Sequence, residues 1–450
     1  MKLSHITLKN FRRYEAARFH FHEQFTVLIG NNGRGKTTVL DALAMMLNTY
    51  FQGSSLTTGG GTISKDDARL IYTEKQGQVF RERQSDVSLN AAAIVSGSPV
   101  SWQRDIGDRG GKAKDLVKLG AQARSHITQG GSVDLPLLLY YGAGRLWTLH
   151  DNIETEKPSS QLDAYRYCLD PKSDQKSFEK WFKKLAYTEL QKSSKIPANQ
   201  VVKNAVLTCI PGAIDFYHDT DYDELTIQLE KEGLMPFNSL SDGYRNMVGM
   251  VADIAHRAAR LNPQMGERAG AQTAGVVLID EIDLHLHPKW QRRVVMDLKK
   301  AFPKIQFIAS THSPFILQSL LPGEVIDLDR ALEMKEMESL PLGVAAPAPD
   351  AAFSNRSIED IVEGVMAVPL PQRGQRYQEM FNAAKAYFAL LKQPIAPEDN
   401  AKQTLKDKLD KLSAPFSDNV AYHAFLEMKR LAAGVITADD EPEGLKGSQE

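Results

Sequence analysis

Residues 30–38, with the sequence GNNGRGKTT, constrain this chain more than any other stretch. They match the phosphate-binding loop pattern G-x-x-x-x-G-K-[ST] at every fixed position. An apolar, β-favouring run at 25–29 precedes the loop, and a helical pattern follows it from 38 to 47. This order of strand, loop and helix turns backbone N–H groups and a helix N-terminus toward a polyphosphate. The stretch predicts a nucleotide site; a chance glycine-rich turn is the alternative, and so complete a match argues against it.

Two side chains of this loop have chemistry of their own. Lys36 is expected to reach the β- and γ-phosphates, and the Thr37 hydroxyl is expected to ligate Mg²⁺. The glycines keep Cβ atoms out of the way of the phosphates. The other predicted nucleotide contacts are Asn31, Asn32, Gly33, Arg34, Gly35 and Thr38.

Charge and cysteine content narrow the class of protein. The chain has 54 Lys and Arg against 56 Asp and Glu, a formal charge of −2. Contact with nucleic acid would therefore need a local basic patch or a partner chain. Cys168 and Cys209 are expected to be free thiols. The N-terminus alternates like a strand, unlike a signal peptide, and no apolar run approaches the roughly 18 residues of a membrane span. We expect a cytoplasmic protein with no membrane partner.

Apolar runs of strand length recur at 135–141, 275–279 and 305–309. Continuous apolar runs are typical of strands that are covered on both faces, as in a parallel sheet. Helical patterns alternate with them, so we predict a doubly wound α/β sheet whose site lies along the carboxyl edge of the strands. Shorter runs at 3–29 and 79–102 predict an additional antiparallel β subdomain.

Asp280 and Glu281 directly follow one of these buried runs. Asp280 can hold the Mg²⁺ shell, and Glu281 is placed to orient and deprotonate an attacking water. An acidic pair after an apolar run is common by chance. Downstream of a complete phosphate loop it becomes a strong indication of an NTP-hydrolysing site.

Four motifs follow one another in an order that resembles the ATP-binding-cassette (ABC) ATPases: the phosphate loop, residues 239–243 (SLSDG), Asp280-Glu281 and His312. Within these the chain is similar to the soluble branch that contains the SMC, RecF and OLD families. Residues 6–12 resemble the typical start of that branch, residues 239–245 its signature loop, residues 282–288 its D-loop, and residues 310–314 its switch-histidine segment. The implied fold is an ABC-type head: a doubly wound sheet, an antiparallel β subdomain and a helical lobe, here with a helical C-terminal region.

More narrowly, residues 139–147 and 356–361 resemble the PtuA-type ATPases of the Septu antiphage systems, which also occur beside retrons. The resemblance implies ATP and Mg²⁺ as cofactors and paired heads that sandwich the nucleotide. Ser241 and Gly243 of one head would cap the γ-phosphate that Lys36 of the other binds. The implied catalytic residues are Glu281, His312 and Lys36, the metal ligands are Thr37 and Asp280, and the further nucleotide or interface contacts are Arg12 and Asp283.

Two departures from the family pattern bear on the hydrolysis rate more than on nucleotide binding. Residues 142–145 (GAGR) stand where a glutamine usually contacts Mg²⁺ and water, with Arg145 as a candidate for that region. Asp242 stands where the commonest signature has glycine.

The sequence predicts six parts. They are an ATPase lobe with the β subdomain (1–150), a helical lobe insertion (151–235), the part with the signature, acidic, D-loop and switch-histidine segments (236–335), a Pro/Ala-rich linker (336–357), a helical C-terminal interaction region (358–435) and a disordered acidic tail (436–450). The leucines at 405, 409 and 412 indicate core or a partner groove, since they last about two heptads, short of a coiled coil.

Other patterns have competing interpretations. His285, His287 and His312 could ligate a metal, but the D-loop assignment is favoured for the first two. Glu363 resembles the start of a TOPRIM nuclease domain without its later Asp-x-Asp, so we expect no nuclease in this chain. The cations between 289 and 300 favour a solvated helix face over a nucleic-acid track.

The leading hypothesis is an ATP-hydrolysing subunit of an antiphage complex that controls a separate nuclease of the HNH (PtuB) type through nucleotide-dependent head dimerisation. DNA or RNA bound through the complex and a retron reverse transcriptase are further candidate partners. The alternatives are a RecF- or SMC-like DNA-repair ATPase that binds DNA directly, and a low-turnover scaffold that retains ATP.

Overall fold

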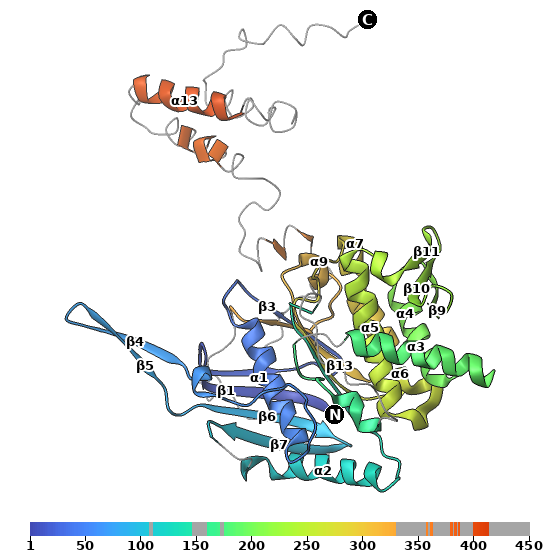
Figure 1. Ribbon diagram of the computed structural model, residues 1–450. Coiled ribbons are helices and arrows are strands. Elements are labelled where there is room, and N and C mark those ends of the chain that lie inside the picture. The colour runs from blue at the N-terminus through green and yellow to red at the C-terminus, as the bar shows by residue number, and fades with distance from the viewer. Residues whose placement is uncertain are drawn as a thin grey trace, which may run out of the picture. The chain divides into compact units, whose positions relative to one another are not determined.

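The computed structural model describes residues 1–107, 111–145, 160–171 and 175–329, and parts of 357–413 (Figure 1). The chain divides into two compact units, residues 1–358 and residues 359–450. Residues 336–356 of the predicted linker (336–357), the tail, Glu363 and parts of both PtuA-like segments lie outside the described residues.

A five-stranded parallel sheet forms the centre of the first unit. Its order is β14 (Val325–Asp327), β3 (Phe25–Ile29), β13 (Ile305–Ser310), β12 (Gly275–Ile279) and β8 (Leu137–Tyr141). Every residue of β3, β13, β12 and β8 is buried, which explains why their sequences are mainly apolar, with Thr26, Gln306 and Ser310 as buried polar exceptions. The register aligns Ile279 with Ala309 and Ala309 with Val27, so the carboxyl ends of three strands meet at one edge. The predicted α/β class is confirmed.

An antiparallel sheet lies beside this core, in the order β2, β1, β6, β7. Its strands are β1 (Lys2–Phe11), β2 (Tyr14–His20), β6 (Ser88–Val95) and β7 (Ser98–Asp105). The helix after the phosphate loop, α1 (Lys36–Asn48), packs on it, and buried Trp102 donates its indole N–H to the Met46 carbonyl oxygen at 3.0 Å. Helix α2 (Lys114–Thr128) contacts β7. This sheet is the predicted β subdomain.

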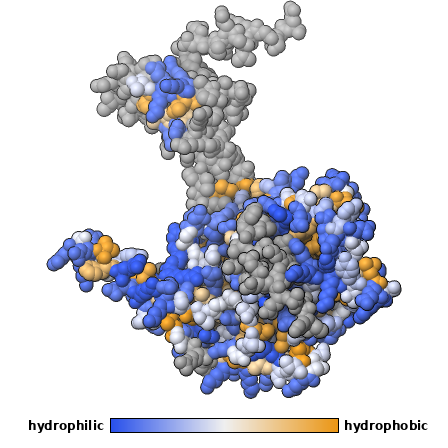
Figure 2. Space-filling model, viewed as in Figure 1, coloured by the Kyte–Doolittle hydropathy of each residue, from blue (hydrophilic) through white to orange (hydrophobic). Residues whose placement is uncertain are grey.

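A separate hairpin, β4 (Leu70–Lys75) and β5 (Gln78–Arg83), projects from the head (Figure 1). Nearly all of its residues are exposed. Figure 2 shows apolar colour on it, to which exposed Val79 and Phe80 contribute.

The lobe between the two halves of the core combines helices with a second antiparallel sheet. It contains η4 (Gln161–Tyr165), α3 (Gln175–Lys192), α4 (Pro197–Cys209), β9 (Ala213–Asp219), β10 (Glu224–Leu229), β11 (Gly233–Pro236) and η5 (Phe237–Ser239). Phe178, Trp181 and Phe182 are buried and form the packed face of α3. Helices form the first part of this lobe, and the antiparallel strands β9, β10 and β11 form its last third.

Helix α5 (Asp242–Leu261) joins this lobe to the core and contacts α3, α4, α6 and β8. The remaining elements of the first unit are short: η1 (Thr49–Phe51), η2 (Lys65–Asp67), η3 (Gly111–Ala113), η6 (Pro263–Arg268), α6 (Ala269–Gln272), α7 (Pro288–Gln291), α8 (Val294–Ala301) and α9 (Pro314–Leu317).

The second unit has a small core of its own around α13 (Asp399–Ser413). Leu409 is buried with Met380 and Tyr387, and Leu405 and Leu412 pack against this cluster. The leucine stripe therefore belongs to a core, the first of the two predicted alternatives.

Two further predictions concern the chain as a whole. Cys168 and Cys209 are free thiols, as predicted; the structure shows that both are buried, and burial raises the pKa of Cys168 to about 12. No helix in the described part of the chain combines the length and the apolar character that a membrane span requires.

Candidate functional site

The phosphate loop connects the end of β3 to the start of α1. Gly35 has φ +95°, and a Cβ added there would lie 2.7 Å from the hydroxyl oxygen of Tyr14, so both its backbone and its neighbours require glycine. Tyr14 in turn donates its hydroxyl to the Arg34 carbonyl oxygen at 2.9 Å. The N-terminal strand pair thus supports the loop from one side, a contact that the sequence did not reveal.

Lys36 folds back over this loop. Its Nζ donates to the Gly30 carbonyl oxygen at 2.7 Å and to the Asn31 carbonyl oxygen at 3.4 Å. Burial lowers the pKa of Lys36, while Asp280 and Asp329 act in the opposite direction. The ammonium group is thereby held above the loop, at the place where a polyphosphate would exchange with the carbonyls.

Asp280 connects three segments that are distant in sequence. The Thr37 hydroxyl donates to Oδ2 of Asp280 at 2.9 Å, and the Ser310 hydroxyl donates to Oδ1 at 2.5 Å. Thr37 and Asp280 offer hydroxyl and carboxylate oxygens, the donors that Mg²⁺ prefers, so this pair fits the predicted metal site. Ser310 is an addition; its place at the end of β13, next to β12 in the sheet, is the signal that could have found it.

Glu281 has an unusual backbone conformation. Its φ is +50°, in the left-handed region that non-glycine residues seldom adopt. Its N–H donates to Oγ of Ser310 at 2.8 Å, and its carbonyl oxygen accepts from Nη2 of Arg145 at 3.0 Å. Such conformations persist when surrounding contacts fix them, and they cluster at functional sites.

The D-loop and the switch-histidine segment contact each other. The Thr311 hydroxyl donates to the Asp283 carboxylate, and the Ser313 hydroxyl donates to Oε1 of Gln291 at 2.6 Å. His312, between these two residues, is exposed at the end of β13. Both predicted residues, Asp283 and His312, therefore lie on the edge that carries Asp280.

The signature loop lies elsewhere. Ser241 is exposed and precedes the first turn of α5, and a Cβ on Gly243 would lie 2.4 Å from the His285 carbonyl oxygen. Glycine at 243 thus lets α5 rest directly on the D-loop backbone. Figure 1 shows α5 and α1 on opposite sides of β13. Lys36 and Asp280 therefore lie together at the sheet edge, whereas Ser241 and Gly243 lie at the N-terminal end of α5.

Other predicted nucleotide contacts already have protein partners. Arg12 donates to the Asp41 carboxylate at 2.5 Å and to the Asp67 carboxylate at 2.9 Å, so its guanidinium lies against the side of α1. The Asn31 N–H donates to Oδ2 of Asp329 at 3.0 Å, and Arg34 pairs with the same carboxylate. The rest of the set, Asn32, Gly33 and Thr38, completes the loop and the first turn of α1.

The cations between 289 and 300 do not share one helix: α7 carries Lys289, α8 carries Lys299 and Lys300, and Arg292 and Arg293 lie between the two helices. Arg293 pairs with Asp297 at 2.7 Å, and Lys299 pairs with Glu324 at 2.5 Å. These internal pairs favour a helix face over a nucleic-acid track. The ring of His287 accepts the Lys289 N–H at 3.2 Å and so caps α7.

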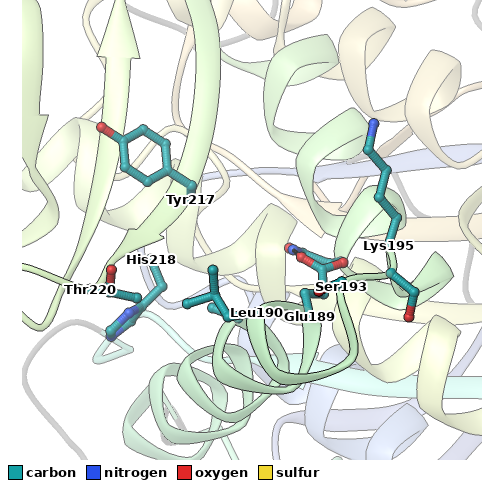
Figure 3. A pocket seen from close by; sticks show the side chains of 10 residues that line it. Glu189, Leu190, Ser193, Lys195, Tyr217, His218 and Thr220 are labelled. Carbon is teal, nitrogen blue, oxygen red and sulfur yellow. Dashed lines mark hydrogen bonds between the residues drawn. The ribbon is translucent and has the colours of Figure 1, made fainter.

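A pocket of 470 Å³ lies between the end of α3, the start of α4 and β9 (Figure 3). None of the predicted site residues lines it. Its Glu189 accepts the Ile196 N–H and the Asn199 amide, both at 2.6 Å, and so caps α4. The pocket is thus a feature of the lobe, separate from the sheet edge.

Comparisons with known proteins agree with this geometry. A model of the family described as "AAA domain" matches residues 5–205, and one described as "AAA domain, putative AbiEii toxin, Type IV TA system" matches residues 149–318.

Three similar proteins have names that bear on function. A retron Vc95 probable ATPase from Vibrio cholerae is 25% identical over 76% of this chain and 77% of its own length. A retron Ec83 probable ATPase from Escherichia coli is 25% identical over 91% of this chain and 87% of its own length. A Septu protein PtuA from Bacillus mycoides is 32% identical over 47% of this chain, but over only 27% of its own length.

Among solved structures, the SMC head domain from Thermotoga maritima overlaps 73% of this chain and 94% of its own, with a TM-score of 0.40 and 13% identity. The overlap is too loose to support the fold assignment, which depends on the sheet order and the motifs.

Proposed function

We propose that this chain, an ABC-type ATPase related to the retron ATPases and the Septu PtuA proteins, is a nucleotide-controlled subunit of an antiphage complex. The observation that carries the proposal is the division of its site. Lys36, Thr37 and Asp280 meet at one sheet edge, while Ser241 and Gly243 project from α5. In this proposal a single head supplies both halves, and a second head brings the signature half of one copy to the phosphate-loop half of the other.

Each residue at the sheet edge has a specific task. Thr37 and Asp280 would hold Mg²⁺, which neutralises charge on the phosphates, and Lys36 would exchange the Gly30 carbonyl for phosphate oxygens. Glu281 would take the proton of the attacking water. His312, exposed at the end of β13, would contact the γ-phosphate.

The second half of the site would come from another copy. Ser241 and the N-terminus of α5 offer a hydroxyl and backbone N–H donors to the γ-phosphate of a facing head. ATP would therefore join two heads, and hydrolysis would separate them. We propose that this cycle controls a separate nuclease of the HNH (PtuB) type, with nucleic acid or a retron reverse transcriptase as further members of the complex.

The test compares Glu281→Gln with Lys36→Ala in the full chain, with ATP turnover and mass in solution measured together. We expect Glu281→Gln to bind ATP and form larger assemblies while turnover falls by about 100-fold or more, because only the proton acceptor is lost. Lys36→Ala should bind ATP weakly and stay unpaired. Lys231→Ala, at the exposed β10–β11 turn, is the control. Equal behaviour of the two site variants would overturn the proposal.

One observation favours a second candidate, a scaffold that retains ATP with little turnover. The segment 142–145 lacks the usual glutamine, and Arg145 contacts backbone carbonyls. Tight ATP binding with no turnover in the wild type, alone or with its partner, would select this candidate. A DNA-repair role has narrower support, since the similarity to RecF of Lactococcus lactis spans 49 residues. Salt-dependent DNA binding by the isolated chain would favour it.

A further inference from the structure

Arg145, in the loop after β8, connects three segments of the site from behind. Its side chain is buried with 4% exposure. Its Nη1 donates to the Asp280 carbonyl oxygen at 2.7 Å and to the Gly142 carbonyl oxygen at 3.1 Å, and its Nη2 donates to the Glu281 carbonyl oxygen at 3.0 Å. Its Nε donates to Oδ1 of Asn246 at 2.6 Å. All four hydrogen bonds of the guanidinium group thus go to other atoms of the protein.

Burial lowers the pKa of Arg145 to about 10, against the opposing effect of the carboxylates of Asp280 and Glu281. The group therefore stays charged at neutral pH. A buried charge with four hydrogen bonds is costly to rearrange, because each acceptor that moves away leaves donor capacity unsatisfied. The segments that Arg145 joins are expected to move together.

Asn246 extends the connection to the D-loop. It lies near the start of α5, is 4% exposed, and donates its Nδ2 to the Leu284 carbonyl oxygen at 2.9 Å while Oδ1 accepts from Arg145. The amide therefore connects the helix that begins at the signature loop with both the acidic loop and the D-loop.

A second contact fixes α5 to the same strand. The Tyr141 hydroxyl donates to Oδ2 of Asp253 at 2.8 Å, and Arg257 donates to Oδ1 of Asp253 at 2.9 Å. α5 is thus joined to β8 at Asp253 and to the loop after β8 at Asn246. Only the Asn246 contact reaches Glu281, which makes the Tyr141 contact a natural control.

We propose that Arg145 and Asn246 are positioning residues that transmit engagement of the signature loop to Glu281. The backbone of Glu281 is held on both sides, by Arg145 at the Asp280 and Glu281 carbonyls and by Ser310 at its N–H. Its left-handed φ depends on these contacts, so a shift of α5 changes where its carboxylate points. The inference rests on the proposed head pairing. It also assigns a task to the segment where a glutamine was expected.

The test uses Arg145→Lys and Asn246→Asp. Lysine keeps the charge but lacks the planar fork that contacts three carbonyls. Aspartate keeps the acceptor for Arg145 but loses the donor to Leu284. We expect both variants to keep ATP affinity within about twofold while kcat falls about 10- to 100-fold, because misplacing a catalytic group by about 1 Å costs that much. Turnover per chain should also stop rising with protein concentration.

Tyr141→Phe is the matched control, since it removes the other β8–α5 hydrogen bond at similar burial. It should keep wild-type kcat even if the melting temperature falls. The double variant Arg145→Lys/Asn246→Asp should be less impaired than the product of the single effects, because both break one connection. Asn246→Asp preserves side-chain size and carries the test if Arg145→Lys does not fold.

Two failures are distinguishable. If wild-type turnover does not depend on protein concentration and Glu281→Gln forms no assemblies, head pairing is wrong. The proposed transmission through Arg145 and Asn246 is then wrong as well. If wild-type turnover does depend on protein concentration but Asn246→Asp has the same kcat as Tyr141→Phe, only the proposed transmission through Arg145 and Asn246 is wrong.

Discussion

The phosphate-loop half and the signature half of this site are held in opposite ways. In the first, the side chains expected to meet ATP contact the protein itself: Lys36 contacts the Gly30 carbonyl and Thr37 contacts Asp280. In the second, Ser241 stays exposed, while Asn246 and the close approach of Gly243 to the D-loop fix the helix from behind. In the proposed complex, ATP would therefore displace contacts in the phosphate-loop half and would meet a preformed surface in the signature half.

This difference separates affinity from pairing. An internal hydrogen bond to a charged group contributes about 1.5–3 kcal/mol net, and a bond of similar strength to the ligand would offset its loss, so the phosphate-loop half can exchange partners. The signature half has no such exchange to make, since the backbone of α5 is already packed against the D-loop. Changes in the first half should alter ATP affinity, and changes behind the second half should alter turnover and assembly.

Gly243→Ala should break the signature half with the largest effect. Its Cβ would lie 2.4 Å from the His285 carbonyl oxygen, so the backbone of α5 or the D-loop must shift. We expect turnover and ATP-induced assembly to fall about 100-fold, since a shift of about 1 Å suffices for such a loss, with ATP affinity of the single head unchanged. Parallel turnover assays and titrations measure both quantities.

Gly249→Ala is the control for this substitution. It lies in the same helix, and its Cβ would meet only the Phe237 ring, at 3.9 Å. Alanine there should stabilise the helix by up to about 1 kcal/mol and leave turnover intact. If Gly243→Ala also behaves in this way, the signature helix does not depend on close packing against the D-loop.

The two halves also differ in how far the sequence predicts them. The phosphate loop and Asp280-Glu281 are contiguous patterns that encode their own backbone geometry, so their places were predictable. Arg145 and Asn246 are 101 residues apart, and Arg145 and Asp280 are 135 apart. No local pattern pairs them; their contact exists only because β8 lies beside β12 in the sheet. The strand at 233–236 was missed because it has only four residues, two exposed and two half-buried, which do not alternate.

The packing of α5 can be tested by the pH dependence of stability that its buried His256 should cause. Burial lowers its pKa to about 4, and Nδ1 lies 3.7 Å from the Asp253 carboxylate, with Trp181 stacked at 4.0 Å. The unfolded chain binds the proton at higher pH than the folded chain does, so stability is full above about pH 6.5 and is lost as pH falls toward 4. Between pH 7 and 5.5 we expect a loss of about 1 kcal/mol from this group.

Urea unfolding at several pH values measures this loss, and His256→Phe is the comparison because it keeps a ring against Trp181. The variant should lose less stability than the wild type between pH 7 and 5.5. Asp253, whose pKa falls to about 2 mainly through Arg257, titrates below this window and does not contribute there. Identical pH profiles for the two proteins would mean that His256 is not held neutral.

Asp329 should sharpen the phosphate-loop half with the smallest effect. Its carboxylate accepts the Asn31 N–H at 3.0 Å and pairs with Arg34, so it places a negative charge beside the loop. Asp329→Asn keeps an acceptor for the N–H and releases Arg34 toward the phosphates. We expect ATP to bind about threefold more tightly at low salt, since a partly exposed charge contributes up to about 1 kcal/mol and is screened as salt rises.

Asp329→Ala, which also loses the acceptor, should gain less ATP affinity, and Asp221→Asn in the β9–β10 turn should gain none. Weaker binding by Asp329→Asn would mean that this carboxylate supports the loop instead of competing with ATP for it.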